Sequence, residues 1–338
     1  MAEQRAPVHL ISLHELKRNQ VDDLLDLSMR LKRRAGKASL SGKTVGLLFF
    51  RGSLRTRTSL EAATTQLGGN TINLSAASDF WELESAEGSI MDGRAPEHVK
   101  DAAAVLSCYV NALAIRPKPA GASWSVDRRD AEIRMWARHA RVPVINMESV
   151  LWHPLQALAD LMTMRESLGD LRGKKLAFVW THSPTPANPA AVHSLLLAAI
   201  SQGMHVRVGA PAGYELDSEV MSQAQALAQE NATSILSTTS MPEAARGAHV
   251  VYARSWHSLE DYGNPTLAAS RRSRANSWMI DEKLMASGAE ARLMHAMPVR
   301  RNLEVTDEVL DGPRSLIVQQ AENRLHSQKA VLSLLLGS

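Results

Sequence analysis

A turn between a predicted strand and a predicted helix carries the residues whose chemistry is easiest to assign. It reads Ser53-Leu54-Arg55-Thr56-Arg57. The N-terminus of a helix leaves backbone N–H groups without intrahelical partners and carries partial positive charge, so it attracts anions before any side chain is counted. Two hydroxyls and two guanidiniums add donors that match phosphate oxygens. Capping explains one hydroxyl but not two arginines at the positive end of a dipole, so we interpret the turn as a phosphate site.

This turn resembles the Ser-Thr-Arg-Thr-Arg loop of the aspartate/ornithine carbamoyltransferase family, with Leu54 in the second place. In that family the loop binds the phosphate of carbamoyl phosphate. The resemblance therefore assigns Ser53, Leu54, Arg55 and Thr56 to carbamoyl phosphate. It also implies that Arg57 has the more structural role of the two arginines.

Length and composition predict a globular protein of two domains. The chain has 338 residues, which is too long for one ordinary core, and 45% of them are hydrophobic and 22% charged. The net charge is only +3, which argues against a dedicated nucleic-acid binder. The basic runs Lys32-Arg33-Arg34 and Arg271-Arg272 leave nucleic-acid binding as a weaker alternative, and a solvated helix face explains the first run more simply.

Targeting and redox signals favour a cytoplasmic protein that does not enter a membrane. The single cysteine, Cys108, excludes a disulfide framework and suggests a reducing compartment. The N-terminal residues Met1–Arg5 lead into no signal-peptide pattern, and no apolar run reaches membrane-spanning length.

Short apolar segments alternate with longer amphipathic ones, which predicts an α/β fold of mostly parallel sheets flanked by helices. The expected strands are Thr44–Phe50, Thr71–Leu74, Ala112–Ile115, Val142–Met147, Lys175–Trp180, His205–Ala210, His249–Ala253, Arg292–Ala296 and Leu316–Val318. The expected helices are Leu13–Ala35, Ser59–Leu67, His98–Tyr109, Asp127–Ala140, Pro154–Ser167, Ala190–Gln202, Ser218–Asn231 and Asn323–Leu336.

Similar segments precede the two expected strands Thr44–Phe50 and Lys175–Trp180. These segments are Leu40-Ser41-Gly42-Lys43 and Leu171-Arg172-Gly173-Lys174. Two such starts suggest two lobes with a boundary near residue 150. The resemblance implies that residues 1–150 bind carbamoyl phosphate, that residues 151–321 bind an amino-acid substrate, and that the active site lies in the cleft between the lobes. It also implies that the C-terminal helix, residues 322–338, packs back on the first lobe.

Two further groups are expected to act on the carbamoyl group and its phosphate. Pro154 suits the first position of a helix, which places His153 and Gln156 three residues apart at its start. The segment matches the family's His-Pro-x-Gln motif, whose side chains hold the carbamoyl group. Arg116 closes a predicted strand, and open α/β sheets bind ligands at the carboxyl ends of their strands. A surface arginine would be the simpler explanation, but the family has an arginine there that contacts carbamoyl phosphate.

The segment His295–Pro298 resembles the family's His-Cys-Leu-Pro motif, with Ala296 in place of the cysteine. The resemblance assigns Met297 to carbamoyl phosphate, and Ala296 and Arg300 to the second substrate. Backbone carbonyls at Ala296 and Met297 could orient the attacking amine. Arg324 matches the family's C-terminal arginine that reaches carbamoyl phosphate.

The residues expected to read the second substrate resemble the N-acylornithine branch of the family. The ornithine branch shows a Ser-Met-Gly pattern that is missing from Val251–Trp256, where Arg254 stands in place of a lysine that holds the substrate carboxylate. Glu148 belongs to a similar Met-Glu pair, and Asn188 to a similar Pro-rich segment. Trp81 lies in a loop like the one that serves the neighbouring subunit's site in these enzymes, so a homotrimer with shared sites is expected.

Pro96 bears on the acyl group. The N-acetylornithine enzymes carry glutamate after the segment that resembles Met91-Asp92-Gly93, whereas the N-succinylornithine enzymes carry proline. A glutamate would repel the extra succinyl carboxylate, and a proline would not. Alternatively, Pro96 only starts the following helix.

The expected function is carbamoyl transfer from carbamoyl phosphate to the side-chain amine of an N-acylated ornithine, favouring N-succinyl-L-ornithine over N-acetyl-L-ornithine, in arginine biosynthesis. Neither a metal nor an organic cofactor is expected. Ala296, Ser183 in place of a family histidine, and Arg51-Gly52 before the phosphate turn depart from the family. They leave open a different amine acceptor, such as free ornithine, or a non-catalytic ligand-binding paralogue.

Overall fold

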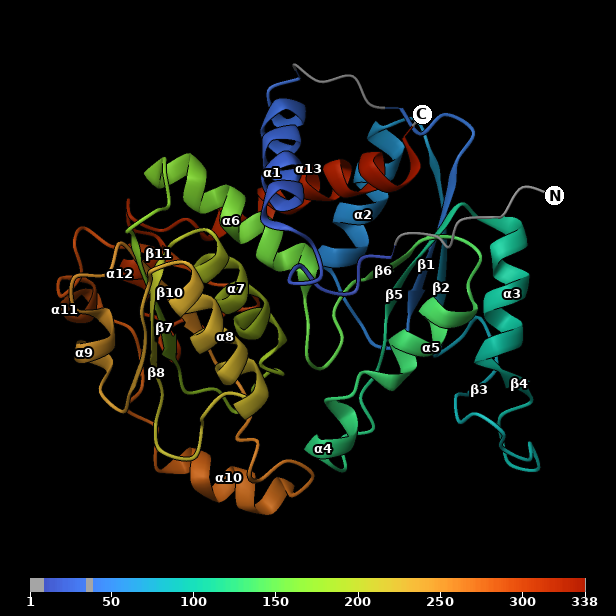
Figure 1. Cartoon of the computed structure of the whole chain (residues 1–338). Coiled ribbons are helices and arrows are strands. Elements are labelled where there is room, and N and C mark those ends of the chain that lie inside the picture. The colour runs from blue at the N-terminus through green and yellow to red at the C-terminus, as the bar shows by residue number, and fades with distance from the viewer. Residues whose placement is uncertain (1–8, 35–38, 338) are drawn as a thin grey trace. The chain divides into compact units, whose positions relative to one another are not determined.

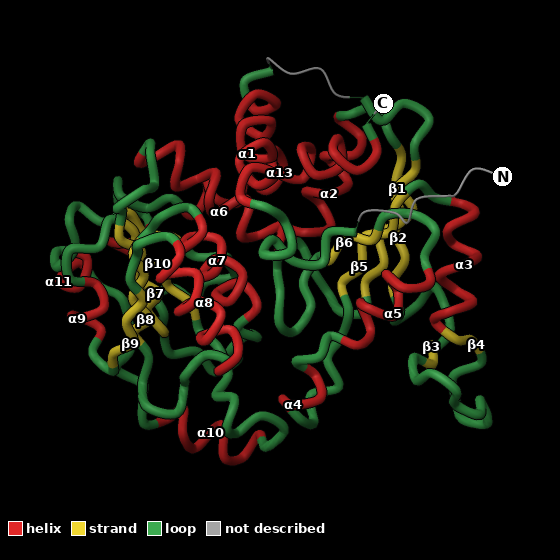
Figure 2. Tube along the Cα trace, in the orientation of Figure 1, coloured by secondary structure: helices red, strands yellow, loops and turns green. Residues whose placement is uncertain are grey.

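The computed structural model of the chain describes residues 9–34 and 39–337 and divides into two compact units (Figure 1). Unit 1 comprises Met1–Pro119, Asp127–Leu155 and Arg324–Ser338. Unit 2 comprises Ala120–Val126 and Gln156–Asn323. Each unit contains a parallel sheet flanked by helices, which confirms the predicted fold class (Figure 2).

The sheet of unit 1 has the order β2-β1-β5-β6, and all of its pairings are parallel. Its strands are β1 (Thr44–Phe49), β2 (Asn70–Ser75), β5 (Ala112–Arg116) and β6 (Val144–Asn146). The helices within this unit are α1 (Arg18–Lys32), α2 (Arg55–Gln66), α3 (Val99–Tyr109) and α5 (Ala131–His139). A separate pair of two-residue strands, β3 (Leu83–Glu84) and β4 (Glu97–His98), precedes α3. The core lies where α3 and α5 pack on the sheet.

The sheet of unit 2 has the order β11-β10-β7-β8-β9, again fully parallel. Its strands are β7 (Lys175–Trp180), β8 (His205–Gly209), β9 (Ile235–Thr238), β10 (Val250–Arg254) and β11 (Arg292–Met294). The smaller helices are α4 (Trp124–Asp127), α9 (Met241–Ala245), α10 (Pro265–Ser273), α11 (Glu282–Met285) and α12 (Asp307–Leu310), and the longer ones are α7 (Ala190–Ser201) and α8 (Ser218–Glu230). Helices α7 and α8 cover one face, and α9 and α11 the other (Figure 1).

Burial explains why the central strands read as continuous apolar runs. Every residue of β10 is buried, as is every residue of β7 after Lys175, which is typical of strands covered on both faces. Helix α7 is buried over Ala190–Ile200 and is accordingly apolar all round.

The similar starts of β1 and β7 fold into the same turn. Gly42 and Gly173 have φ of +71° and +74°, a region that only glycine adopts at little cost. The N–H of Lys43 donates to the carbonyl of Leu40, and that of Lys174 donates to the carbonyl of Leu171. The local sequence therefore encodes this turn twice.

Three helices belong to both units. One is α4, whose last residue Asp127 lies in unit 1. Helix α6 (Pro154–Leu168) contributes its first two residues to unit 1 and the rest to unit 2. Helix α13 (Ile317–Leu336) belongs to unit 2 up to Asn323 and to unit 1 from Arg324. No helix among residues 9–34 and 39–337 is long and apolar enough to cross a membrane.

Several predicted elements were wrong. The expected strand Leu316–Val318 is the start of α13, because a three-residue apolar run cannot distinguish a strand from a helix. The expected helix Asp127–Ala140 begins only at Ala131, as α5, because Asp130 has φ of +50°; Asp127 is instead the last residue of α4. The edge strand β9 was missed because it has no buried residue. Helix α1 starts at Arg18 rather than Leu13, whereas Ala35 and Met1–Arg5 lie outside the described residues.

Candidate active site

The predicted phosphate turn forms the first turn of α2. The helix was expected from Ser59 but begins at Arg55, with Leu54 as its N-cap residue. The Oγ of Ser53 accepts a hydrogen bond of 3.3 Å from the N–H of Thr56. Arg55 and Thr56 therefore lie in the helix terminus itself, where backbone N–H groups can bind an anion.

The arginine Arg57 packs against the sheet of unit 1. Its guanidinium carbon lies 4.4 Å from the ring centroid of Phe49, the last residue of β1. This cation–π contact ties the start of α2 to the strand before it. Leu54, by contrast, is 73% exposed.

Thr56 is the point where distant segments of unit 1 meet. Its Oγ1 accepts a 2.6 Å hydrogen bond from Nη2 of Arg324 on α13 and a 3.4 Å bond from Nη1 of Arg116 at the end of β5. Nη1 of Arg324 lies 3.5 Å from Nε2 of His153, directly before α6. Thr56, His153 and Arg324 are all buried. Four predicted donor-site residues thus come together at the N-terminus of α2.

A buried carboxylate holds one of these arginines. Oε2 of Glu148 lies 2.5 Å from Nη2 of Arg116 and 3.3 Å from Nη2 of Arg51. Arg51 also donates to the backbone carbonyls of Pro117 and Glu148. Glu148, which was expected on the second substrate, is engaged by two guanidiniums, and the sequence did not assign Arg51 to the site.

The environment keeps the imidazole of His153 neutral. Burial lowers its pKa well below the usual value, and Arg324, Arg116 and Arg51 lower it further, whereas Glu148 raises it. Because Arg324 donates to Nε2, the neutral ring carries its proton on Nδ1. A neutral imidazole in this position can donate a hydrogen bond to a carbonyl oxygen.

Gln156 lies in a buried polar network of unit 2. Its Nε2 donates to Oδ1 of Asp160 at 2.8 Å, and Nε2 of Gln320 donates to the same oxygen at 2.7 Å. The hydroxyl of Tyr252 donates to Oδ2 of Asp160 at 2.9 Å. Burial, and then the charge of Asp160, raise the pKa of Tyr252 well above its usual value, so the hydroxyl stays a donor. The network fixes the amide plane of Gln156.

A second network shapes the loop after β11. Nε2 of His295 lies 2.9 Å from Oε2 of Glu304, and Nδ1 of His295 accepts a hydrogen bond of 2.8 Å from the N–H of Met297. The N–H of His295 donates to Oε1 of Gln320. Met297 has φ of +49°, a conformation that non-glycine residues seldom adopt and that often marks a functional site. The carbonyls of Ala296 and Met297 are therefore held by a rigid frame.

Arg254, at the end of β10, is a buried cation. It is 8% exposed, and within the described residues its guanidinium has no hydrogen bond or ion pair. Arg300, in contrast, donates from Nε to Ser183 at 3.2 Å and from Nη2 to Thr185 at 2.8 Å. Asn188 is half-buried and precedes α7.

Trp81 and Pro96 flank the two-residue strands β3 and β4 in unit 1. Trp81 is 73% exposed. Pro96 directly precedes β4, and α3 starts at Val99 with His98 as its N-cap, so Pro96 is not the first residue of that helix. The simpler explanation for Pro96, a helix start, was therefore wrong.

Sequence reasoning missed the residues that hold the predicted ones in place: Arg51, Asp160, Tyr252, Glu304 and Gln320. Only Asp160 had a usable signal, because it follows Gln156 by four residues on one helix and so shares its face. Among the described residues, no group of three His, Cys, Asp or Glu side chains could hold a metal ion.

Comparison with protein families identifies both parts of the chain. Residues 8–166 match the carbamoyl-P binding domain of aspartate/ornithine carbamoyltransferase, and residues 172–335 match its Asp/Orn binding domain.

Carbamoyltransferases of known name are similar to this chain over nearly its whole length. An N-acetylornithine carbamoyltransferase of Xanthomonas campestris pv. campestris is 38% identical over 97% of this chain and 98% of its own length. An ornithine carbamoyltransferase of Parafrankia sp. is 40% identical over 97% of this chain and 96% of its own. The crystal structure of acetylornithine transcarbamylase complexed with acetylcitrulline has a TM-score of 0.94 and 37% identity, covering 98% of this chain and 100% of that one.

A further solved structure is a glutamate-to-proline mutant of N-acetyl-L-ornithine transcarbamylase, complexed with carbamyl phosphate and N-succinyl-L-norvaline. It is 38% identical to this chain with a TM-score of 0.93, and the match covers 97% of this chain and 99% of that one. With two domain models and full-length relatives in agreement, the chain belongs to the aspartate/ornithine carbamoyltransferase family and is a carbamoyltransferase of its N-acylornithine branch.

Proposed function

We propose that the chain transfers the carbamoyl group of carbamoyl phosphate to the side-chain amine of an N-acylated ornithine, and that it prefers N-succinyl-L-ornithine to N-acetyl-L-ornithine. The binding of carbamoyl phosphate is supported by the two guanidiniums of Arg116 and Arg324, which both donate to Thr56 at the N-terminus of α2, and by His153, which lies 3.5 Å from Arg324. A helix terminus, two guanidiniums and a neutral imidazole together suit a phosphate joined to a carbonyl group.

In the proposed reaction the uncharged amine attacks the carbonyl carbon of carbamoyl phosphate. The C–N bond forms, the bond from that carbon to the phosphate oxygen breaks, and the proton that the amine loses goes to the departing phosphate. Arg55, Arg116 and Arg324 balance the charge on the phosphate. Nδ1–H of His153 and the amide of Gln156 stabilise the charge that builds on the carbonyl oxygen. Holding two substrates side by side supplies much of the remaining acceleration.

The buried guanidinium of Arg254 supports an acceptor with a carboxylate. A charged group without a counter-charge is costly to bury, so such groups usually meet a ligand. We assign Arg254 to the α-carboxylate of the acceptor, and the carbonyls of Ala296 and Met297 to the attacking amine. Asn188 and Arg300 complete the second-substrate residues in unit 2.

Pro96 supports a succinyl group rather than an acetyl group. Besides the proline mutant, alanine, valine and serine mutants of the same glutamate in N-acetyl-L-ornithine transcarbamylase are each complexed with N-succinyl-L-norvaline. The feature these four mutants share is the loss of a carboxylate. A residue without a carboxylate, such as Pro96, would remove the repulsion of the succinyl carboxylate in the same way.

Free ornithine is the second candidate acceptor, because ornithine carbamoyltransferases are up to 40% identical to this chain. The segment Val251–Trp256 argues against it, since it lacks the Ser-Met-Gly pattern. A free α-ammonium would also lose its hydration in a site that suits a neutral amide.

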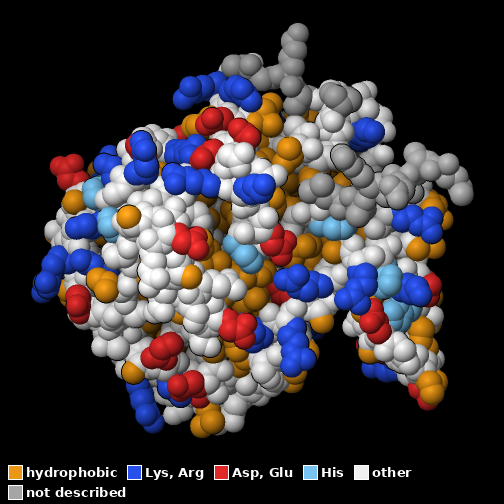
Figure 3. Space-filling view, in the orientation of Figure 1, with side chains coloured by type: hydrophobic (Ala, Val, Ile, Leu, Met, Phe, Trp, Pro, Cys, Tyr) orange, Lys and Arg blue, Asp and Glu red, His pale blue; other side chains and the backbone are white. Residues whose placement is uncertain are grey.

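We further propose a homotrimer in which the loop around Trp81 serves a neighbouring site. Several large apolar side chains of unit 1 are exposed: Leu54, Ile72, Trp81, Ile90, Met91, Val105 and Tyr109. Figure 3 shows hydrophobic side chains at the tip of the loop between β3 and β4. Exposed apolar groups in such number favour burial against another copy of the chain.

The test is kcat/KM for N-succinyl-L-ornithine, N-acetyl-L-ornithine and ornithine with wild type, Pro96→Glu and Pro96→Ala. Wild type should work best on the succinyl compound. Pro96→Glu should shift the preference towards the acetyl compound, and Pro96→Ala should not, because only the first adds a carboxylate. Best activity on ornithine, or an unchanged succinyl/acetyl ratio in Pro96→Glu, would refute the acceptor assignment.

A further inference from the structure

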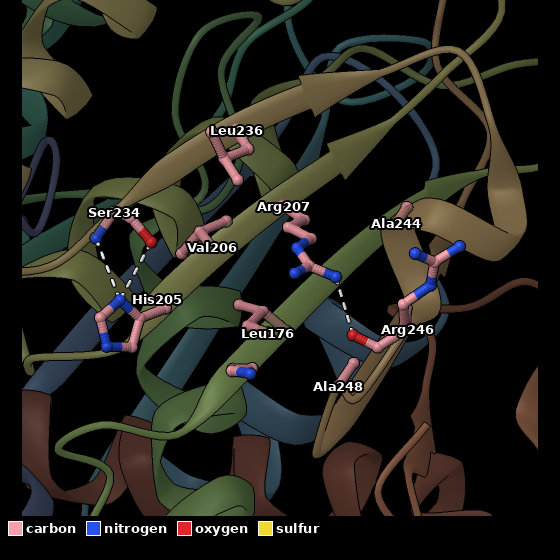
Figure 4. Close-up of a pocket in the computed structure, with 10 residues that line it drawn as sticks. Leu176, His205, Val206, Arg207, Ser234, Leu236, Ala244, Arg246 and Ala248 are labelled. Carbon is pink, nitrogen blue, oxygen red and sulfur yellow. Dashed lines mark hydrogen bonds between the residues drawn. The ribbon is translucent and has the colours of Figure 1, made fainter. Parts of the chain in front are cut away.

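Unit 2 contains a cavity of about 270 Å³ at the amino-terminal ends of β7, β8 and β9 (Figure 4). Its lining residues are Lys175, Leu176, His205, Val206, Arg207, Ser234, Leu236, Ala244, Arg246 and Ala248. The residues of unit 2 assigned above to the second substrate, Asn188, Arg254, Ala296 and Arg300, lie at or after the carboxyl ends of β7, β10 and β11. The cavity is therefore at the opposite edge of the sheet and is separate from them.

The cavity exists because α9 is too short to cover the face of the sheet on which it lies. The helix has five residues, a length of roughly 7.5 Å, whereas the five residues of β8 span about 16 Å. Because side chains alternate along a strand, His205 and Arg207 point to the same face of β8. Arg207 is opposite Leu236 in the register of β8 and β9. This part of the face is left open beside the end of α9.

Hydrogen-bond donors dominate the polar lining of the cavity. Nη1 of Arg207 donates to the carbonyls of Glu243 and Arg246 at 3.0 Å and 2.7 Å, which fixes the guanidinium. Nδ1 of His205 accepts the N–H of Ser234 at 3.1 Å, so the neutral ring carries its proton on Nε2. The lining contains three cationic side chains and no carboxylate.

Stabilisation of a helix terminus accounts for only one of these cations. Arg207 binds the last carbonyls of α9, as basic groups at helix C-termini commonly do. Within the described residues, the side chains of Lys175 and Arg246 make no hydrogen bond or ion pair. Their charge is therefore available to a ligand.

An apolar floor lies between the polar groups. In Figure 4, His205 and Ser234 lie on one side, Arg207 and Arg246 on the other, and Leu176 and Val206 between them. Leu236, on the edge strand β9, is 56% exposed and adds an accessible apolar side chain to this floor. The arrangement suits a molecule with an anionic group and a compact apolar body.

We propose that this cavity binds a small organic anion, with a phosphate or carboxylate held by Lys175, Arg207 and Arg246 and an apolar part against Leu236. Its volume is slightly below the usual range for ligand pockets, so the ligand is compact. The site is independent of the carbamoyl-transfer reaction, and its ligand does not compete with carbamoyl phosphate.

The test is isothermal titration calorimetry of the full chain with phenyl phosphate and, separately, phenylacetate, each in the presence of excess carbamoyl phosphate. We expect at least one probe to bind, and its affinity to fall tenfold or more in Arg246→Glu and in Lys175→Ala. The control is Arg274→Glu, which makes the same charge change at an exposed arginine of unit 2 outside the cavity.

The stronger of the two probes identifies the anionic group. If neither probe binds to wild type, if carbamoyl phosphate displaces the bound probe, or if Arg274→Glu weakens binding as much as Arg246→Glu, the proposal is wrong. Circular dichroism of each variant shows whether it is folded. If Arg246→Glu does not fold, the binding affinity of Lys175→Ala tests the site instead.

Discussion

Nη2 of Arg116 lies 2.5 Å from Oε2 of Glu148, and both side chains are largely buried. The carboxylate also holds Arg51, so one negative charge orients two guanidiniums. Arg116 in turn reaches Thr56 at the N-terminus of α2. Glu148 therefore positions a guanidinium of the proposed phosphate site, in addition to the contact with the acceptor that the family resemblance implies.

Replacing Glu148 by glutamine should destabilise the protein by about 3–5 kcal/mol, because it leaves a buried guanidinium without a counter-charge. Arg51→Gln should cost much less, since it leaves the Arg116–Glu148 pair intact and Arg51 is more exposed. Thermal unfolding of both variants tests this. Adding inorganic phosphate should raise the melting temperature of Glu148→Gln by more than it raises that of wild type, because the bound anion replaces the lost carboxylate charge. Equal melting temperatures for the two variants would contradict the assigned role.

Arg55→Ala should strongly reduce carbamoyl transfer. Losing a charge-assisted contact to phosphate should cost on the order of 2–5 kcal/mol, which is about 30-fold to several thousand-fold in kcat/KM. The matched control is Arg18→Ala, because Arg18 is an exposed arginine of unit 1 that lies 3.9 Å from Asp22 on its own helix. Wild-type turnover and carbamoyl-phosphate affinity in Arg55→Ala would remove it from the site.

Subunit mixing tests whether active sites are shared. Arg55→Ala and Trp81→Ala should each be strongly impaired, and co-assembled mixtures should regain part of the activity because some sites receive both intact halves. Activity is measured on mixed oligomers separated by a tag on one variant. No recovery in verified mixed oligomers would mean that Trp81 serves the site of its own chain or none.

Tyr252→Phe should lower both stability and turnover. It removes the hydrogen bond that Tyr252 donates to Oδ2 of Asp160, a buried carboxylate, and losing a hydrogen bond to a charged group should cost about 1.5–3 kcal/mol. It should also lower kcat more than it raises KM for the acceptor, because Asp160, the partner of Gln156, is held less firmly. The control is Tyr109→Phe, which removes the hydroxyl of a tyrosine that is 67% exposed. A melting temperature unchanged from wild type would show that the network does not stabilise unit 2.

The raised pKa of Asp130 predicts how the stability of the protein depends on pH. Burial raises its pKa to about 6 from about 3.8, although Ser149 and the N–H groups of Leu151 and Val150 oppose the rise. Below pH 3.8 both folded and unfolded chains carry this proton. As the pH rises towards 6 only the folded chain keeps it, so stability is lost across this window, by about 3 kcal/mol in total.

Asp130→Asn has no proton to lose at this position. The difference in unfolding free energy between wild type and Asp130→Asn should therefore fall steadily from pH 4 to pH 6.5 and then level off. Denaturant titrations at half-unit pH steps measure it, and groups that do not interact with Asp130 cancel in the difference. Glu132 does not cancel, because its pKa is raised by burial and also by the charge of Asp130. A difference that is flat over this range would show that Asp130 has an ordinary pKa.

The sequence alone identified the elements and motifs that depend on neighbouring residues. The alternation of strands and helices, the paired Gly-Lys starts of β1 and β7, and the strand-to-helix turn at Ser53–Arg57 could be read directly, because periodicity, turn chemistry and helix termini act over a few residues. Where the local signal was weak, as in the edge strand β9 and at the start of α13, the prediction was wrong.

The tertiary structure decided which of those residues meet. Arg324 reaches Thr56 across 268 residues of sequence, and Gln320 reaches Asp160 across 160. Nothing in the local pattern specifies such contacts, because they arise only when sheets and helices pack and bring separate segments to the same place. The same holds for Arg51, which reads as a departure from the family in the sequence and in the fold becomes a second partner of Glu148. The local sequence determines which chemical groups are present, and long-range packing determines the distances between them and the shifts in their pKa values.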